Sequence, residues 1–478
     1  MTTLPASNAG LSRRKFLTLT ASTLGGAALL GSGLSMRTAG AASPAGYKAL
    51  VCLYLNGGND GFNWLVPTSS AAYSQYSTSR GLLALPQSSL LSLAASASGG
   101  IAACSDGTSP QYGLHPSCPE LQALFNAGSA AFVCNVGTLI QPTTVAQARA
   151  ASVPLPPQLF SHADQSAEWM LGNAASADRY GWAGLLADAM TAAGNSAKLA
   201  YNIQVGGPNY WQQGTITNPY ALSTNGPVST DVFSNTGYRG GARAAAAQAL
   251  LAQDATDANI LVATHAGIWK NSGAKLNLVD TSLSSAGDFS ATTFPAGVSD
   301  GVDWGLSAQL HEVARVIRAQ SQIGDARQLF FVEIGGFDTH DGELATQAKL
   351  LGFVSQYVNA FMNAMTQINM QNNVTLFTMS DFGRTLSPNN DGADHGWGNH
   401  HMVVGGAVQG GRFYGSMPSL VLGGINDYGY GRMVPTTSSD QYAATLATWF
   451  GTAPADLANI FPNLANFSSS NLGFMAAA

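Results

Sequence analysis

Aspartate and histidine side chains gather in two late segments of the chain, residues 335–341 and 394–401. These are the residue types that hold divalent cations in proteins. Glycines in both segments let the backbone bend closely around an ion. The two segments therefore predict a shared metal site. The candidate ligands are Asp338, His340, Asp381, Asp394, His395 and His400, with Asp60 from an early loop.

Each of these residues also has an ordinary structural explanation. Aspartate is common in turns, where its side chain bonds the local backbone. A lone histidine is more often a packed or surface imidazole than a ligand. His395 and His400 are five positions apart, which does not place them on one helical face. A loop geometry is needed, and Gly396 and Gly398 allow one.

A second candidate is Ser161, with His162 beside it, after a proline-rich stretch. Ser161 suits a helix N-cap, because a helical pattern follows at residues 167–171. It also suits a nucleophile, since a helix N-terminus favours a bound oxyanion and a metal ion lowers the pKa of a hydroxyl. Both interpretations stay open. His162 is a candidate proton relay, and Arg384 is a candidate for holding an anionic oxygen or for a structural ion pair.

Short apolar runs precede or follow these polar segments. Continuous apolar runs bounded by glycine are typical of parallel strands covered on both faces. Ligands of open α/β sheets bind beyond the carboxyl ends of the strands, so the polar loops should converge on one edge. The expected strands are residues 49–55, 131–136, 329–334, 374–379 and 402–404.

Amphipathic helical patterns at residues 306–317, 344–368 and 442–450 alternate with these runs. The alternation predicts an α/β fold, with a doubly wound, mostly parallel sheet flanked by helices. Residues 205–300 are rich in Asn, Gly, Ser and Thr and poorly periodic, so we expect a loop-rich insertion or cap there. The folded domain is expected to span residues 43–478.

The chain of 478 residues has an unusually low charge. Charged residues make up 10 % of it, against roughly 25 % in an average globular protein. Hydrophobic residues make up 46 %, which excludes a highly charged disordered protein. The formal net charge is −6, and no basic run follows the first forty residues. The composition thus argues against a nucleic-acid partner.

The first 42 residues are typical of a twin-arginine export signal. Arg13 and Arg14 precede a weakly apolar stretch, and small residues at 39–41 offer a cleavage site. The stretch is broken by glycines and is too weakly hydrophobic for a stable membrane anchor. We therefore expect a periplasmic or secreted protein that meets the twin-arginine translocase during export.

Four cysteines lie beyond this signal. Cys104 and Cys118 lie in loop-like sequence and could close a short disulfide loop. Cys52 and Cys134 lie inside apolar runs, where a buried free thiol is expected. The chain contains no C-x-x-C motif, so a cysteine zinc site is not expected.

Several of these segments resemble the bacterial domain-of-unknown-function 1501 family. The resemblance is carried by residues 54–61, 161–165, 380–385, 394–401, 405–411 and 434–442 and covers about residues 48–468. That family is similar in fold to the alkaline phosphatase and sulfatase superfamily. Members of the superfamily hydrolyse phosphate or sulfate esters with one or two metal ions and a Ser, Thr or modified Cys nucleophile.

The resemblance implies roles for matching positions and also shows two departures. The acidic ligand after the first strand falls near Asn56 or Asp60, and the nucleophile near Ser161. The remaining ligands fall at Asp338, His340, Asp381 and either His395 or His400. The usual Asp-His pair is Asp381-Phe382 here, and an asparagine, Asn56, directly follows the first strand.

The resulting hypothesis is an exported hydrolase of small anionic esters that uses zinc, manganese or calcium. Asp338, His340, Asp381 and a histidine of residues 394–401 would hold the cation. Ser161 or water would attack, and Arg384 would steady the anionic group. The alternative is a catalytically silent binding or assembly protein on the same fold, which the missing histidine at Phe382 favours.

Overall fold

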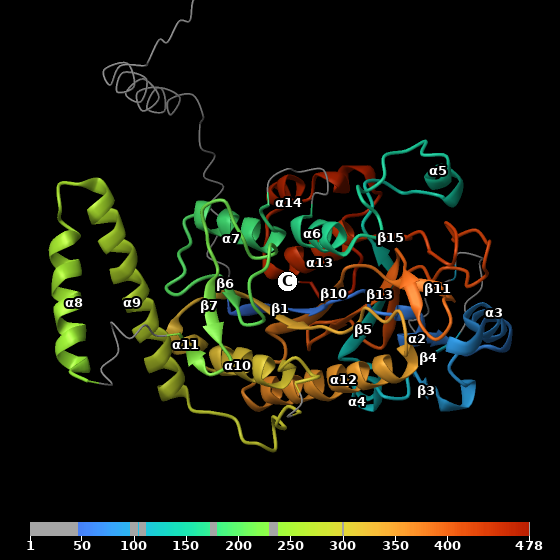
Figure 1. Ribbon diagram of the computed structural model, residues 1–478, viewed down its shortest axis with the longest axis horizontal. Coiled ribbons are helices and arrows are strands. Elements are labelled where there is room, and N and C mark those ends of the chain that lie inside the picture. Colours follow the sequence, from blue (N-terminus) through green and yellow to red (C-terminus); the bar gives the residue numbers. More distant parts are fainter. Residues whose placement is uncertain are drawn as a thin grey trace, which may run out of the picture. The chain divides into compact units, whose positions relative to one another are not determined.

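The apolar runs form one ten-stranded sheet in the computed structural model, which describes residues 46–95, 104, 111–172, 179–228, 238–298 and 301–477 (Figure 1). The described residues belong to a single unit, Ser43–Ala478. The predicted export signal lies outside them. The strands, in spatial order, are β14 (Arg412–Gly415), β5 (Ala130–Gly137), β13 (Asn399–Val404), β10 (Val374–Ser380), β1 (Lys48–Leu55), β9 (Arg327–Ile334), β6 (Asn202–Gln204), β7 (Tyr220–Ser223) and β8 (Gly226–Pro227), with β15 (Thr437–Ser438) also paired to β5.

Strand β1 lies at the centre of this sheet and is buried on both faces. Val51, Leu53 and Leu55 join the hydrophobic core on one side. Leu50 and Tyr54 join the core on the other side, as the alternation of side chains along a strand requires. This two-sided burial explains the continuous apolar run that the sequence shows.

The sheet is mostly parallel, but β13 runs antiparallel to both of its neighbours, β10 and β5. The expectation that residues 402–404 form a parallel strand was therefore wrong. The reversal matters for the site. The segment that precedes an antiparallel strand lies at the same edge as the segments that follow parallel ones. Residues 394–398 therefore reach the edge where β1, β9 and β10 end.

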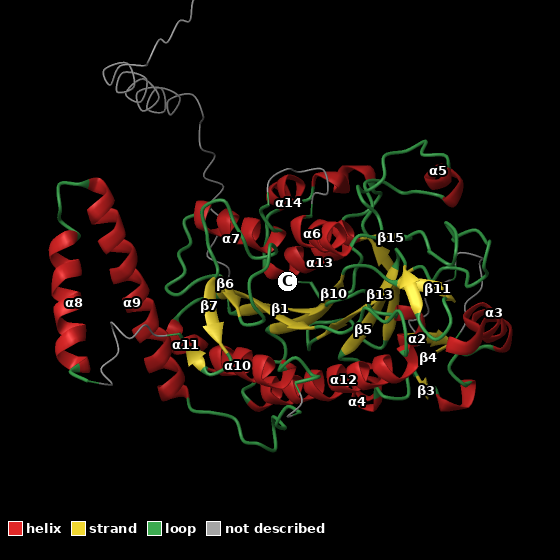
Figure 2. Cartoon of the chain, in the orientation of Figure 1, coloured by secondary structure: helices red, strands yellow, loops and turns green. Residues whose placement is uncertain are grey.

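Helices cover both faces of the sheet, which confirms the predicted doubly wound α/β fold (Figure 2). Apolar side chains of α10 meet one core at the spacing expected of an amphipathic helix. The helices on this face are α4 (Pro119–Asn126), α10 (Leu306–Arg318) and α12 (Glu343–Gln367). Those on the other face are α6 (His162–Leu171), α7 (Trp182–Ala192), α13 (Ser439–Phe450) and α14 (Pro454–Ile460).

The described part of residues 205–300 contains two helices in addition to loops and short strands. It contains α8 (Gly240–Asp254) and the long helix α9 (Ile260–Ala286). Helix α9 contacts α10 and the short helix α11 (Gln320–Ile323). Both α8 and α9 have weak amphipathic patterns, because most of their residues are exposed and many in α8 are alanine. A periodicity argument has little to detect in such helices.

Smaller elements surround the polar edge of the sheet. Two of them, β11 and β12, pair as a hairpin, and β2, β4 and β3 form a separate three-stranded sheet. Their bounds are α2 (Gly61–Trp64), β2 (Leu65–Pro67), α3 (Ser70–Arg80), β3 (Leu91–Ser92), β4 (Tyr112–Leu114), α5 (Val145–Arg149), β11 (Arg384–Pro388) and β12 (Ala393–His395).

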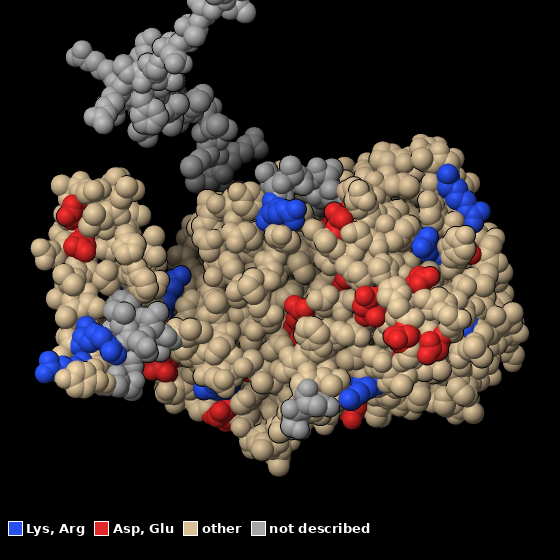
Figure 3. All heavy atoms as spheres, in the orientation of Figure 1, with Lys and Arg blue, Asp and Glu red and all other residues tan. Residues whose placement is uncertain are grey.

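All four cysteines are buried, and Cys52, Cys118 and Cys134 are free thiols. The predicted disulfide option between Cys104 and Cys118 is therefore wrong, and the expectation for Cys52 and Cys134 is confirmed. Across the residues that the structure describes, none of the helices has both the length and the apolar character needed to span a bilayer. Figure 3 shows few charged side chains on an otherwise uncharged face, as the composition requires.

Candidate metal centre

Three central strands end level with one another and deliver their polar loops to one edge of the sheet. Leu55 of β1 pairs with Ile334 of β9 on one side and with Ser380 of β10 on the other. Asp338 follows β9, and Asp381 directly follows β10. The predicted convergence of these loops is what parallel strands of equal extent produce.

The hairpin of β11 and β12 brings His395 to the same edge. Arg384 and His395 are partners across this hairpin. Gly396 follows, and a Cβ at this position would lie only 2.6 Å from the carbonyl oxygens of Gly383 and Arg384. Glycine is therefore needed for the close approach of the two backbone segments.

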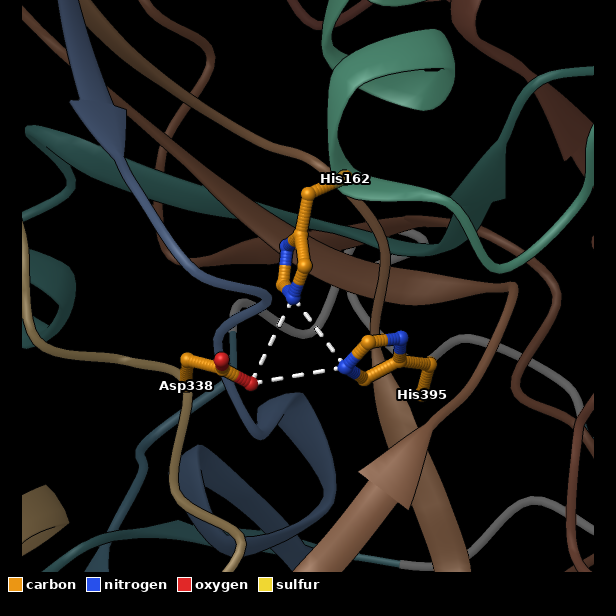
Figure 4. Close-up of side chains that lie close together, drawn as sticks. All are labelled: His162, Asp338 and His395. Atoms are coloured by element: carbon orange, nitrogen blue, oxygen red, sulfur yellow. Dashed lines mark hydrogen bonds and ion pairs between the residues drawn. The ribbon is translucent and has the colours of Figure 1, made fainter.

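Three side chains meet in the space that these loops enclose (Figure 4). The Nε2 atoms of His162 and His395 are 3.0 Å apart. Asp338 Oδ1 lies 3.4 Å from each of them. His340 joins from the side, with its Nε2 atom 3.0 Å from both His395 Nε2 and Asp338 Oδ1. We call these four residues the His–Asp cluster.

Each imidazole of the cluster has an oxygen atom at its other ring nitrogen. His162 Nδ1 lies 2.6 Å from Asp381 Oδ2, and His395 Nδ1 lies 2.8 Å from the carbonyl oxygen of Phe160. His340 Nδ1 lies 3.3 Å from Asp394 Oδ1. Carboxylate and carbonyl oxygens only accept, so in the neutral rings these Nδ1 atoms carry the proton. The Nε2 atoms then present lone pairs.

This arrangement fits a divalent cation. Three nitrogen lone pairs and a carboxylate oxygen within 3.0–3.4 Å of their neighbours repel one another unless a positive charge lies between them. An outer oxygen that fixes the tautomer and orientation of a ligating histidine is the usual support of such a site. Burial lowers the pKa of His395, which keeps that ring neutral near pH 7.

His162 and Asp338 respond to their charged neighbours. The hydrogen bond to Asp381 raises the pKa of His162, against the opposing effect of burial. Burial alone would raise the pKa of Asp338, but its hydrogen bond with Arg384 and the charges of Arg384, His162 and His340 together lower it. Asp338 is therefore ionised near neutral pH and available as a ligand.

Arg384 ties the loops together. Its buried guanidinium donates to Asp338 Oδ1 at 2.5 Å. It also donates to four backbone carbonyls, those of Gly57, Gly58, Phe337 and Ala393. Such a set of contacts is what a rigid planar fork of donors provides. The structure places Arg384 as a clamp beneath the cluster rather than as an open anion-binding group.

Two predicted ligands, Asp381 and Asp394, contact the outer ring nitrogens of cluster histidines. Asp381 is buried, and its second oxygen accepts from the Tyr54 hydroxyl at 2.7 Å and the Gly57 amide at 3.2 Å. Asp394 lies behind His340 in the same way. Neither carboxylate is among the donor atoms that meet in the cluster. Asp338 and Asp381 thus lie at opposite nitrogens of one imidazole, His162.

The other predicted residues are not among the donor atoms of the cluster. Asp60 forms a buried ion pair with Arg80, which also bonds Glu343. His400 is buried, accepts from the Asn135 amide at 3.1 Å, and packs its ring edge-on against Phe62. Burial lowers the pKa of His400 to about 3. Ser161 begins α6, but its hydroxyl donates to Asp164 at 2.6 Å rather than capping the helix.

Sequence reasoning missed Tyr54 and gave His162 a different role. Tyr54 is the second-last residue of β1, so its side chain points to the face that α6 covers. An alternation argument along β1 would have placed it beside the loop after β10. His162 was expected to relay protons, whereas its Nε2 atom belongs to the cluster. Phe382 packs its ring against both His162 and His395, at 4.8 and 4.7 Å between centroids.

Substitution of Asp381 by asparagine is expected to weaken zinc binding by about 10- to 100-fold, the usual effect of losing an outer partner. The amide keeps the shape but removes the charge that holds the His162 proton on Nδ1. Competition against a chromophoric chelator measures the change. Asp288→Asn is the matched control, because Asp288 bonds His311 at 2.7 Å outside the cluster. Equal zinc affinities of Asp381→Asn and wild type would show that Asp381 does not contribute to metal binding.

The fold and the cluster together define a class: a doubly wound α/β protein with a candidate metal centre at the carboxyl edge of its sheet. Within it, this chain belongs to the family described as protein of unknown function (DUF1501), whose model matches residues 47–427. The family resemblance seen in the sequence is thereby confirmed. No curated protein matches the chain.

Solved structures similar to the chain include sulfatases and phosphatases. The sulfatase PsFucS1 from Pseudoalteromonas sp. is 10 % identical over 97 % of this chain and 75 % of its own, with a TM-score of 0.34. A phosphonate monoester hydrolase from Silicibacter pomeroyi is 9 % identical over 70 % and 69 %, with a TM-score of 0.31. A mutant of the alkaline phosphatase PafA is 12 % identical over 72 % and 64 %, with a TM-score of 0.27.

Proposed function

We propose that the chain is an exported zinc-dependent hydrolase of phosphate or sulfate esters. The observation that carries the proposal is the donor set of the His–Asp cluster, in which three oriented imidazoles and one carboxylate face one another. Nitrogen-rich sets of this kind suit zinc, whereas calcium prefers oxygen ligands alone. The twin-arginine segment supports export to the periplasm or beyond.

A zinc ion held by His162, Asp338, His340 and His395 would supply a Lewis acid for the ester oxygen. The residues of the chain have their own parts. Asp381 keeps the proton of His162 on Nδ1, and the apolar ring of Phe382 packs against the His162 ring. Arg384 holds Asp338 in place.

Ser161 is the nucleophile in this proposal. Its hydroxyl already donates to Asp164, which would accept the proton as the oxygen attacks phosphorus or sulfur. The bond to the ester oxygen would break, the leaving alcohol would take up that proton, and water would then hydrolyse the ester formed on Ser161. The N-terminus of α6, a helix of ten residues, lies at the same point and favours an anionic group. Small anionic esters are the proposed substrates, and we propose no nucleic-acid partner.

The test combines elemental analysis of the purified mature protein with a panel of aryl phosphates, phosphonates and sulfates. One zinc per chain and hydrolysis of one ester class are expected. Ser161→Ala should lower kcat by about a hundredfold or more, given the usual size of such losses, while the zinc content stays unchanged. Ser152→Ala, outside the site, is the control. Hydrolysis by a zinc-free protein would overturn the proposal.

A catalytically silent binding protein is the second candidate. The contacts of Arg384 favour it, because the donors of this buried arginine are already engaged by Asp338 and backbone carbonyls. Under this alternative the protein holds zinc but hydrolyses none of the esters. The same panel therefore separates the two candidates.

A further inference from the structure

A cavity of about 870 Å³ opens beside the His–Asp cluster, at the carboxyl ends of β1 and β9. Tyr54 and Phe331 form its inner wall, and Tyr180 and Tyr210 lie at its outer part, 38 % and 42 % exposed. We call it the Tyr54 cavity. Its size is within the usual range of cavities that hold small organic ligands.

The cavity is joined to the cluster through two links. Tyr54 lines the cavity and donates its hydroxyl proton to Asp381, which in turn orients His162. Ala163, which also lines the cavity, directly follows His162. The cavity therefore borders the residues that orient and adjoin His162.

The polar groups of the cavity include both donors and acceptors. Glu333 uses one carboxylate oxygen to accept from Asn56 at 2.6 Å, and its other oxygen bonds none of the described residues. The Ser166 hydroxyl donates to the Tyr54 oxygen at 2.6 Å, because the one Tyr54 hydroxyl proton goes to Asp381. The hydroxyls of Tyr180 and Tyr210 bond none of the described residues, so they too can serve a ligand.

Charge and shape narrow the class of ligand. Arg179 lies over the Tyr210 ring at 5.0 Å. Among the described residues that line the cavity, Glu333 is the one acid and Arg179 the one base, so their formal charges cancel. A strongly anionic body gains little in such a cavity. Flat aromatic faces beside mixed donors and acceptors instead suit a body with apolar C–H faces and many hydroxyl groups.

We infer that the Tyr54 cavity binds the sugar body of a carbohydrate ester, with the ester group directed to the His–Asp cluster. Only the placement of the ester group at the cluster rests on the proposed function. The binding of the sugar body rests on the cavity itself. An aryl body is the competing ligand, since it would use the tyrosine faces but leave the second carboxylate oxygen of Glu333 without a hydrogen bond.

The test is calorimetric titration of the intact protein with a panel of neutral oligosaccharides, and with 4-nitrophenol as the aryl probe. At least one oligosaccharide should bind, and Tyr210→Ala and Glu333→Gln should each weaken it by about tenfold, a typical value for one lost contact group. Tyr238→Ala is the control, because Tyr238 is 82 % exposed and does not line the cavity.

The outcomes separate this inference from the proposed function. Sugar binding should persist in His395→Ala, which disrupts the cluster but not the cavity, so an inactive protein can still support the inference. Binding of 4-nitrophenol in place of every oligosaccharide would overturn it. So would sugar binding that survives both Tyr210→Ala and Glu333→Gln, even in a protein that hydrolyses aryl esters.

Discussion

Under the proposed function, replacement of His395 by alanine is expected to abolish stoichiometric zinc binding and ester hydrolysis together. Its Nε2 atom lies 3.0–3.4 Å from the other three donor atoms of the cluster, so an ion held among these four atoms would lose one ligand. Loss of an outer partner typically lowers metal affinity 10- to 100-fold, so loss of a ligand should lower it by more than about 100-fold. Elemental analysis and chelator competition measure the change.

Two further variants make this result specific. His265→Ala removes an exposed histidine of α9 and should leave one zinc per chain. His395→Cys restores a ligand of the kind that zinc accepts and should recover part of the affinity. A full complement of zinc in His395→Ala, with an unchanged dissociation constant, would show that the metal lies elsewhere or that the cluster is held by hydrogen bonds alone.

The strands and loops of the polar edge could be predicted because their signals are local. Continuous apolar runs identify buried strands, and a polar segment at each strand end identifies the ligand-binding edge. This reasoning predicted Asp338, His340 and His395 as candidate ligands. The family resemblance then gave the fold class, which the two-sided helical cover confirms.

The division of labour within the site could not be predicted from the sequence. Asp338 and Asp381 both follow strands that end level, and nothing in their sequence context says which one meets the cluster. The distinction arises because β10 delivers Asp381 into a buried position under His162. Tertiary placement of α6 decides it, and no local pattern records that placement.

The aromatic residue that replaces an expected histidine now has a physical account. Phe382 packs on the rings of His162 and His395. Gly58, with φ of 81°, passes so close that a Cβ there would lie 2.6 Å from the Phe382 ring. The position is thus part of an apolar wall around one cluster. This packing favours a single metal ion in our proposal rather than two.

Asp60 shows why a charged residue at a strand end need not be a ligand. It lies in the loop after β1, as the resemblance required, but Arg80 at the end of α3 turns it into a buried ion pair. Glu343, the first residue of α12, completes the group at 2.9 Å from Arg80. All three side chains are fully buried, and the Arg80 guanidinium bonds both acids.

Replacement of Arg80 by methionine is therefore expected to destabilise the fold strongly. Removal of one partner from a buried ion pair leaves an uncompensated charge, and this typically costs about 3–5 kcal/mol. Arg80 also donates to the backbone carbonyl of Thr385 at 2.8 Å, so the hairpin that carries His395 would loosen. Urea unfolding measures the loss, and Arg243→Met, on exposed surface of α8, is the control.

Replacement of Glu343 by glutamine, in contrast, is expected to change the pH dependence of stability more than stability itself. Burial raises the pKa of Glu343, with a further upward contribution from Asp60, so the folded chain keeps a proton that the unfolded chain releases. Stability contributed by this site therefore falls as pH rises above the ordinary Glu pKa, until the raised folded value is passed. Glutamine mimics the protonated form, keeps a hydrogen-bond acceptor for Arg80, and should remove this slope while changing stability little at low pH. The measurement is the free energy of unfolding of wild type and Glu343→Gln at several values between pH 5 and 8. If the two free energies changed with pH in the same way, Glu343 would be ionised in the folded chain, and Arg80 would balance two full negative charges rather than one.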